Sequence, residues 1–338
     1  MDPQVGGEEH LAAADVVMSD GPRPSAQRPE SQRGRLARVD LVVLVHRDAP
    51  TVVVRSLRAL ADSMGADWAG RIVLVQNASP AATAQAAESE LVSSFPSAHI
   101  VSVLSRRNLG YAAGVNLGVA HTTAPYVGVF NPDGVTRPET VARLAGALDD
   151  DGSVFMAGAR TVSTTALEAS PPRGRLRVAW LPGTAILFRR ERFLDIGGFD
   201  PGFFMYCEDV DLSRRARARG WKLVVVLEAV FVHARGFDGL ESLRRIRMWT
   251  VSNTSLVYQY GAPRWRAMAR LARQRAGWFR DLARRRRGWT LAGAVIGSVA
   301  WSVSIPRLER RRRHPWDGAA LSSWLAKAAR HVRIAELQ

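Results

Sequence analysis

The sequence predicts an α/β fold with a parallel first half, a mixed-sheet second half and a basic helical C-terminal extension. Short apolar, β-branched runs alternate with amphipathic segments from residue 39 to about residue 150. Beyond about residue 240, strand-like runs end and arginine becomes frequent. The chain has 338 residues, and the 47% that are hydrophobic are enough to bury a sizeable core.

The first half repeats strand and helix four times, which is a Rossmann-like pattern. Strands are expected at Val39–Val45, Arg71–Val75, His99–Leu104 and Tyr126–Phe130, and helices at Pro50–Met64, Ala81–Ser93, Tyr111–His121 and Pro138–Leu148. Residues 151–236 are mixed, with strands near Val178–Phe188 and Leu223–Val232 and a helix at Asp209–Arg219. Ligands in such sheets bind at the carboxyl ends of strands, so the loops after residues 45, 75, 104 and 130 are the expected site.

Three parts follow from these patterns: a disordered tail at 1–35, a folded domain at 36–240 and the basic helical extension at 241–338. The first twenty residues are acidic without a continuous apolar stretch, so no signal peptide is expected. Cys207 is the single cysteine, which rules out an intrachain disulfide. The net charge of +16 fits a nucleic acid, an anionic lipid or a phosphorylated ligand.

Two acidic segments are candidates for chemistry. Asp133 follows the fourth predicted strand and could reach a divalent cation, although Asn131-Pro132-Asp133-Gly134 is also a turn sequence. Glu208, Asp209 and Asp211 open a helix behind the apolar run 203–206, where burial would tune a carboxylate for general-base work. Ordinary helix capping explains the same acids.

Two further features are weaker on their own. Residues 106–118 join a strand to a helix, and their glycines allow either close approach of a ligand or close helix packing. The asparagines Asn108 and Asn116 in this segment supply hydrogen-bond donors and acceptors. His233 ends the last apolar strand, where a structural role is the ordinary interpretation.

Taken in order, these segments resemble family 2 glycosyltransferases of the GT-A fold, particularly the rhamnosyltransferase-like branch. Asn131-Pro132-Asp133 matches the family's form of the Asp-x-Asp motif, and the run from Gly197 to Leu212 matches its Gly-Gly-Phe-Asp and Glu-Asp-x-Asp-Leu elements. The resemblance covers about residues 39–236. It implies a nucleotide-binding half, an acceptor-binding half and inverting transfer of a sugar, with rhamnose the one that the branch indicates. The donor would be a dTDP- or UDP-sugar, and the acceptor a hydroxyl of a glycan or polyprenyl-linked acceptor in cell-envelope polysaccharide synthesis.

The resemblance also implies a role for each matching residue. Asp209 would be the catalytic base and Glu208 its supporting neighbour, with Asp211 as the alternative base. Asp133 and His233 would hold Mn²⁺ or Mg²⁺. The nucleotide sugar would be bound by Asp48, Gln76, Asn77, Arg107, Asn108, Gly110, Asn116 and Asn131, and the acceptor by Gly183 and Thr184.

Two positions depart from the family pattern. His46-Arg47-Asp48 replaces the usual Thr-Tyr-Asn, and Gln76 replaces the Asp that usually meets the base of the nucleotide. These departures favour an alternative function, a non-catalytic protein that binds sugar nucleotides or acts as a scaffold. The joint presence of both acidic segments and His233 favours the enzyme.

The C-terminal extension predicts contact with a membrane. Arg284–Arg287 and Arg310–Arg313 flank Trp289–Ile305, a nearly uncharged stretch shorter than the ~20 residues of a spanning helix. We expect this helix to lie on an anionic surface, so that the protein is cytoplasmic and peripheral on the inner face of the plasma membrane. A buried helix of the soluble fold is the alternative. Nucleic acid is not expected, because the arginines surround an apolar segment without an array of stacking aromatics.

Overall fold

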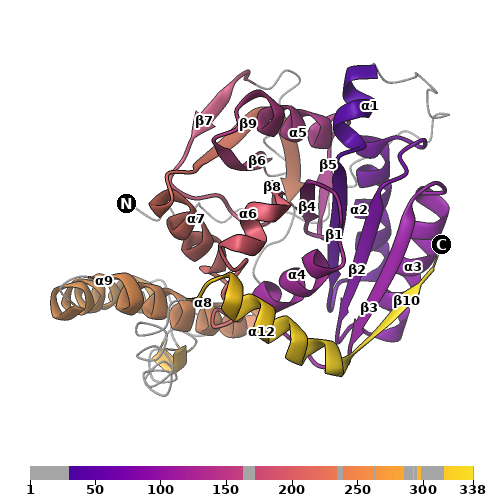
Figure 1. The fold of residues 1–338 in the computed structure, drawn as a ribbon. Coiled ribbons are helices and arrows are strands. Elements are labelled where there is room, and N and C mark those ends of the chain that lie inside the picture. The colour runs from indigo at the N-terminus through magenta and orange to yellow at the C-terminus, as the bar shows by residue number, and fades with distance from the viewer. Residues whose placement is uncertain are drawn as a thin grey trace.

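The computed structural model describes residues 30–162, 172–233, 239–261, 264–284, 292, 295–297 and 316–337. Across these residues the chain forms one ten-stranded mixed sheet with helices on both faces (Figure 1). The fold begins with a short helix, α1 (Glu30–Leu36), whose last residue is buried. The indole of Trp68 donates a hydrogen bond to the carbonyl of Leu36. The expected disordered tail at 1–35 therefore overlaps a helix from Glu30, and residues 1–29 lie outside the described residues.

The Rossmann-like half contains the predicted alternation. Its elements are β1 (Val39–Val45), α2 (Pro50–Met64), β2 (Arg71–Asn77), α3 (Ala81–Ser94), β3 (His99–Ser105), α4 (Tyr111–Ala120) and β4 (Tyr126–Phe130). β1 pairs in parallel with β2 and β4, and β2 pairs in parallel with β3. The carboxyl ends of these strands therefore meet at one edge of the sheet, as the sequence predicted.

The second half is the mixed part of the sheet. It comprises β5 (Gly134–Thr136), α5 (Thr140–Asp150), β6 (Val154–Val162), β7 (Arg175–Arg177), β8 (Ala185–Arg189), α6 (Arg190–Asp195), α7 (Glu208–Ala218) and β9 (Lys222–His233). β8 runs antiparallel to both β4 and β6, whereas β6 and β9 are parallel. The strand expected at Val178–Phe188 starts only at Ala185, because Pro182 and Gly183 favour a turn before it.

The extension after residue 238 is not helical throughout. It contains α8 (Gly239–Tyr260), α9 (Arg264–Arg284), α12 (Gly318–Ala328) and a final strand, β10 (Val332–Glu336). β10 pairs antiparallel with β3 and so completes the sheet, whose order is β10-β3-β2-β1-β4-β8-β6-β9-β5 with β7 beside β9. Val332, Ile334 and Glu336 are every second residue and so share one face of this strand. The frequent arginines of the extension made this short strand hard to recognise in the sequence.

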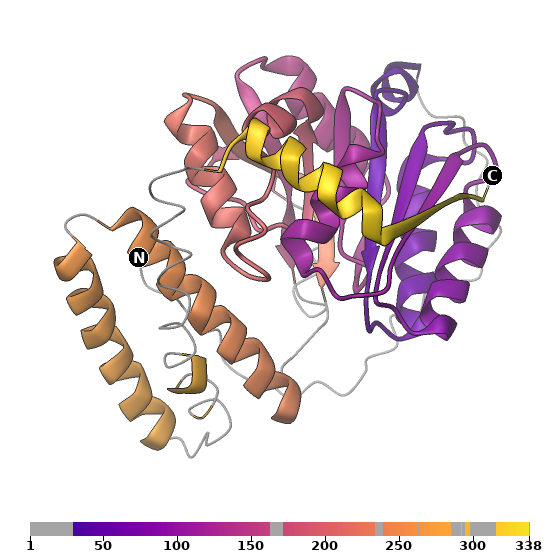
Figure 2. The ribbon, with the colours of Figure 1, turned by 60° about the horizontal axis from the view of Figure 1, so that its bottom comes forward.

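α8 and α9 form a helical hairpin beside the sheet, and α12 crosses the sheet domain on its way to β10 (Figure 2). The indole of Trp316, which precedes α12, is buried and donates a hydrogen bond to the carbonyl of Gly197. The predicted interfacial helix at Trp289–Ile305 falls almost wholly outside the described residues, which include only 292 and 295–297 of it. Among the helices that are described, none has the length and apolar character needed to cross a membrane.

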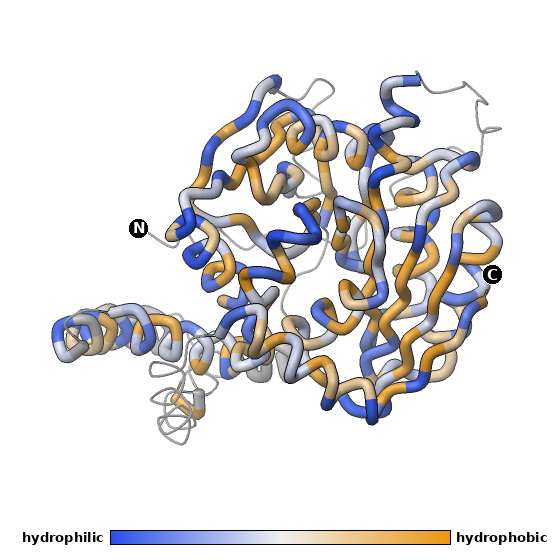
Figure 3. Tube along the Cα trace, viewed as in Figure 1, coloured by the Kyte–Doolittle hydropathy of each residue, from blue (hydrophilic) through white to orange (hydrophobic). Residues whose placement is uncertain are grey.

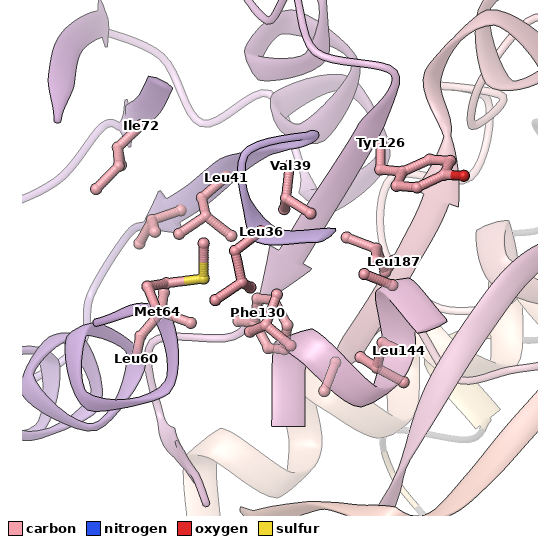
Figure 4. Packing of buried hydrophobic residues seen from close by; sticks show 14 of the residues in the cluster. Leu36, Val39, Leu41, Leu60, Met64, Ile72, Tyr126, Phe130, Leu144 and Leu187 are labelled. Carbon is pink, nitrogen blue, oxygen red and sulfur yellow. The ribbon is translucent and has the colours of Figure 1, made fainter. Parts of the chain in front are cut away.

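Two hydrophobic clusters, one on each face of the sheet, form the core. Leu41 and Val43 of β1 belong to the cluster under α2, α3 and α5, whereas Val42 between them belongs to the cluster under α4, α6 and α7. Figure 4 shows part of the first cluster, with Leu60 and Met64 of α2 close to Leu41. The central strands β1 and β4 are accordingly mostly apolar along their length (Figure 3), as expected where both faces are covered.

Candidate active site

The strand register brings the predicted metal and acceptor segments together. Phe130 of β4 pairs with Ala185 of β8, so the next residue, Asn131, donates its backbone N–H to the carbonyl of Thr184 at 2.8 Å. Gly134 of β5 pairs with His233 of β9. Segments more than 40 residues apart in the sequence thus meet at one edge of the sheet.

Asp133 and His233 form the candidate metal pair. Asp133 Oδ2 lies 3.2 Å from His233 Nε2, and their side chains are 12% and 27% exposed. A carboxylate and an imidazole nitrogen can share a cation whose remaining positions are taken by substrate phosphates and water. The described part of the chain contains no group of three or more His, Cys, Asp or Glu side chains arranged around a metal, so the substrate would have to supply further ligands.

Glu208 and Asp209 begin α7 after a constrained turn. Tyr206 and Cys207 adopt left-handed backbone conformations, with φ of 69° and 66°, that cost energy in residues other than glycine. Asp209 Oδ2 accepts the backbone N–H of Gly183 at 3.1 Å, and its Oδ1 accepts the N–H of Val210 at 2.8 Å. The turn thus directs Asp209 to the segment that the sequence predicted as acceptor-binding.

Burial raises the pKa of both carboxyl groups. For Glu208 the pKa is well above its ordinary value, because of burial and then the charge of Asp209. Burial also raises the pKa of Asp209, but two backbone N–H groups favour its charged form. Glu208 Oε2 is buried without a hydrogen-bond partner among the described residues. The negative charge of the pair therefore resides preferentially on Asp209.

Tyr111 connects these segments and was not predicted as a site residue. Its hydroxyl donates to the carbonyl of Gly183, whose N–H is bound by Asp209. Burial raises the pKa of Tyr111 well above its ordinary value, and the charges of Glu208, Asp209 and Asp133 raise it further. The hydroxyl therefore stays protonated, and the carboxyl groups of both acidic segments lie near it. In the sequence, only its position directly after Gly110 pointed to it.

The expected nucleotide loop is held by an asparagine network. Asn77 Nδ2 donates to Asn108 Oδ1 at 3.1 Å and to the carbonyl of Gly110 at 3.2 Å, while Asn77 Oδ1 accepts from the N–H of Leu109 at 2.7 Å. His46 Nδ1 donates to the carbonyl of Asn77 at 2.6 Å, and its Nε2 accepts from Asn108 Nδ2 at 3.0 Å. His46, a departure from the family pattern, thus takes part in shaping this loop.

Gly110 brings the expected nucleotide loop against residues 203–207, the loop before α7 that is named the catalytic loop here because the predicted base Asp209 follows it. Its φ is +82°, and a Cβ at this position would lie 2.1 Å from the carbonyl oxygen of Phe204. That carbonyl accepts the N–H of Tyr111 at 2.8 Å. Glycine is therefore required here by both conformation and space.

Three residues expected to bind the nucleotide, Gln76, Asn77 and Asn116, use amide atoms for hydrogen bonds within the protein. Asn116 is fully buried and its amide binds both the N–H and the carbonyl of Phe199, while its role in nucleotide binding stays a prediction. Gln76 Nε2 donates to Glu88 at 2.5 Å and to Ser102 at 2.9 Å. Asn77 is also buried, and its amide shapes the loop.

The remaining predicted residues lie at the same edge. Asp48 Oδ2 accepts the backbone N–H of His46 at 3.3 Å, so Asp48 orders the loop after β1. Arg107 and Asn108 are exposed and follow β3 directly. These three residues accompany Asn131 on the side of the sheet where a nucleotide is expected.

Asp211 has a structural environment, unlike Asp209. Its side chain is fully buried, Tyr260 of α8 donates to Oδ1, and Arg215 donates twice to Oδ2, at 2.9 and 2.7 Å. Ser252 of α8 also donates to the carbonyl of Met205 at 2.8 Å. These contacts account for Asp211 without a catalytic role, and they attach α8 to the catalytic loop.

The architecture and this site define a GT-A-type glycosyltransferase fold. Two solved structures resemble it at TM-scores of 0.53. One is the mannosyltransferase PcManGT from Pyrobaculum calidifontis, in complex with GDP-Man and Mn²⁺, which is 17% identical and covers 86% of each chain. The other is GalNAc-T7 with UDP, GalNAc and Mn²⁺, which is 12% identical and covers 63% of this chain and 47% of that one.

Residues 41–213, just over half of the 338 residues, match the family model for Glycosyl transferase family 2, and the chain belongs to that family. An N-acetylglucosaminyl-diphospho-decaprenol L-rhamnosyltransferase of Mycobacterium tuberculosis is 29% identical over 290 residues, covering 72% of this chain and 86% of that protein. The rhamnosyltransferase WbbL of Escherichia coli K12 is 34% identical over 77 residues, covering 23% and 29%. The predicted family and branch are confirmed.

Proposed function

We propose that this protein is an inverting, metal-dependent glycosyltransferase that moves a sugar from a dTDP- or UDP-sugar to a hydroxyl of a polyprenyl-linked glycan. Rhamnose is the first sugar to test, since the relatives named above are rhamnosyltransferases and one of them is named for a diphospho-decaprenol acceptor. The observation that carries the proposal is that the N–H of Gly183 holds Asp209, while the next residue, Thr184, binds the N–H of Asn131 in the segment of the Asp133–His233 pair. A place in cell-envelope polysaccharide synthesis follows from that acceptor.

The proton transfer is assigned to Asp209. An acceptor hydroxyl that binds near Gly183 and Thr184 would give its proton to Asp209 as its oxygen attacks the anomeric carbon from the face opposite the leaving diphosphate. Glu208, buried and retaining its proton, supports the charge on its neighbour. Tyr111 holds the carbonyl of Gly183 and so fixes the N–H that orients the base.

Asp133 and His233 fit a divalent cation, Mn²⁺ or Mg²⁺. Their 3.2 Å separation and the acidic surroundings of Tyr111 support this assignment. When bound, such an ion neutralises charge that develops on a leaving diphosphate. Asn131, Arg107 and Asn108 would line the nucleotide side of the same edge.

Calorimetric titration with UDP, dTDP and GDP, with and without Mn²⁺, tests donor binding. We expect metal-dependent binding of UDP or dTDP, followed by transfer from the matching sugar nucleotide to a polyprenyl-diphosphate-linked acceptor. If folded protein binds none of the three nucleotides, the scaffold alternative replaces the enzyme. Gln76, whose amide nitrogen is bonded to Glu88 and Ser102, is the observation that favours that alternative.

A further inference from the structure

An arginine stripe runs along the outer face of α9. It consists of Arg266, Arg270, Arg273 and Arg280, which recur at spacings of four, three and seven residues and are all exposed. These spacings place the four side chains within one face of an α-helix. Among the described residues, none of these four arginines forms an ion pair with a carboxylate, whereas Arg143 of α5 pairs with Glu139 at 2.7 Å.

The opposite face of α9 is occupied by the protein itself. Leu271 is 8% exposed, and Arg275 donates to the carbonyl of Thr250 at 2.9 Å and to the hydroxyl of Thr254. Both threonines belong to α8, so α8 fixes the rotation of α9 about its axis. Because α9 packs against α8 through its other face, the arginine stripe faces outward. The hairpin of α8 and α9 lies beside the sheet (Figure 2).

Apolar side chains are exposed at the start of α9 and in the short described segment 295–297 that follows it. Trp265, at the start of α9, is 68% exposed, and the guanidinium of Arg266 lies 4.9 Å from the centre of its ring. Val295 and Ile296 are each 46% exposed. A Cβ at Gly297 would lie 2.7 Å from the carbonyl oxygen of Arg247, so Gly297 packs closely against α8.

We propose that the outer face of α9, comprising the arginine stripe and Trp265, is a docking surface for an anionic lipid bilayer. Arginines bind phosphate headgroups, and a tryptophan with one face exposed favours the boundary between headgroups and acyl chains. This surface is distinct from the predicted interfacial segment at Trp289–Ile305 and adds a described, oriented helix to it. The surface itself does not depend on the proposed function.

The mixture of charge and exposed apolar residues distinguishes a bilayer from a nucleic acid. Positive charge alone would hold a nucleic-acid duplex, and the duplex would leave the exposed apolar ring of Trp265 in water. A bilayer satisfies both kinds of side chain at once. Docking would also bring the catalytic loop towards the membrane and a polyprenyl-linked acceptor, because Ser252 of α8 holds that loop. Only this consequence rests on the proposed function.

Partition of the full chain onto vesicles tests the surface. The vesicles contain phosphatidylglycerol and phosphatidylcholine, or phosphatidylcholine alone. One variant carries Arg266→Gln, Arg270→Gln and Arg273→Gln. The matched control removes the same charge from exposed arginines elsewhere, as Arg55→Gln, Arg177→Gln and Arg333→Gln.

Wild-type protein should sediment with the anionic vesicles and not with the neutral ones. Each basic residue near an anionic surface changes partition about fivefold, so the stripe variant should bind ~10²-fold more weakly while the control stays within tenfold of wild type. Trp265→Ala should weaken binding further. Circular dichroism and nucleotide titration of the same proteins separate this result from unfolding and from failure of the donor site.

Three outcomes would overturn the proposal. The first is absence of wild-type binding to anionic vesicles, and the second is an equal loss in the stripe variant and its control. The third is a stripe variant that loses affinity for duplex DNA but keeps vesicle binding, which would assign the surface to nucleic acid. Salt sensitivity accompanies either charged partner, so it does not decide between them.

Discussion

Asp209→Asn isolates the proton-accepting role of this carboxylate with little change in shape. The native carboxylate accepts backbone N–H groups from Gly183 and Val210. Asparagine keeps one of these hydrogen bonds and places its NH₂ against the other donor, which costs about 1 kcal/mol. Removal of a buried negative charge offsets that loss. We therefore expect the free energy of unfolding to change by less than about 2 kcal/mol.

Turnover should respond far more than stability. General-base catalysis contributes ~10²–10⁴-fold, which corresponds to about 3 to 5 kcal/mol of the barrier. Initial rates of transfer from labelled sugar nucleotide, together with nucleotide titration, measure the two effects separately. Asp209→Asn should lower the rate by that factor. It should leave nucleotide affinity within about threefold of wild type, which is less than about 1 kcal/mol of binding free energy.

Glu208→Gln is the matched control. Because Glu208 retains its proton, the neutral amide imitates its working state, and the rate should remain within about tenfold of wild type. The reasoning is refuted if Asp209→Asn retains wild-type turnover, or if both variants lose activity equally. The base must be deprotonated and burial raises its pKa, so wild-type activity should fall as the pH drops through a point above the ordinary range of aspartate.

Three further changes test the metal pair, the altered nucleotide position and the C-terminal segment. His233→Ala should weaken Mn²⁺-dependent nucleotide binding about 10- to 100-fold without altering metal-free binding, as titration in the presence of EDTA would establish. Gln76→Asp places a second carboxylate beside Glu88 and should lower the free energy of unfolding in urea by about 1 to 3 kcal/mol. Adding Glu88→Gln should restore most of that free energy. If the effects of the two substitutions simply add, residues 76 and 88 are not coupled. Trp316→Ala removes a buried indole and its hydrogen bond to Gly197, and should cost about 3 kcal/mol. An unchanged denaturation midpoint would mean that α12 docks independently of this tryptophan.

Much of the Rossmann-like half was predictable because its signals are local. β1 is buried on both faces, and its near-continuous run of Val and Leu is visible without knowledge of the fold. The predicted helix Pro50–Met64 matches α2, since Pro lies at its start and Gly65 just beyond its end. The order of the acidic motifs likewise pointed to the confirmed family.

The structure brings several of the predicted site residues to one edge of the sheet, but the contacts that each one makes could not be predicted from the sequence. Asparagine is a residue type that often lines polar binding sites. In this structure, however, Asn116 donates to the backbone carbonyl of Phe199, and Asn77 donates to the carbonyl of Gly110. An asparagine has the same sequence signature whether its partner is a ligand or the backbone. Only the fold determines which partner lies within hydrogen-bonding distance of it.

The sequence by itself determined the α/β class, the family and the approximate place of Asp133, Asp209 and His233, because strand periodicity, turn residues and motif order are carried by neighbouring residues. The tertiary structure alone decided that Gly183 orients Asp209, that β10 closes the edge at β3, and that α8 supports the catalytic loop. Each of these contacts joins segments far apart in the chain. Their geometry depends on register and packing, which no local pattern of residues encodes.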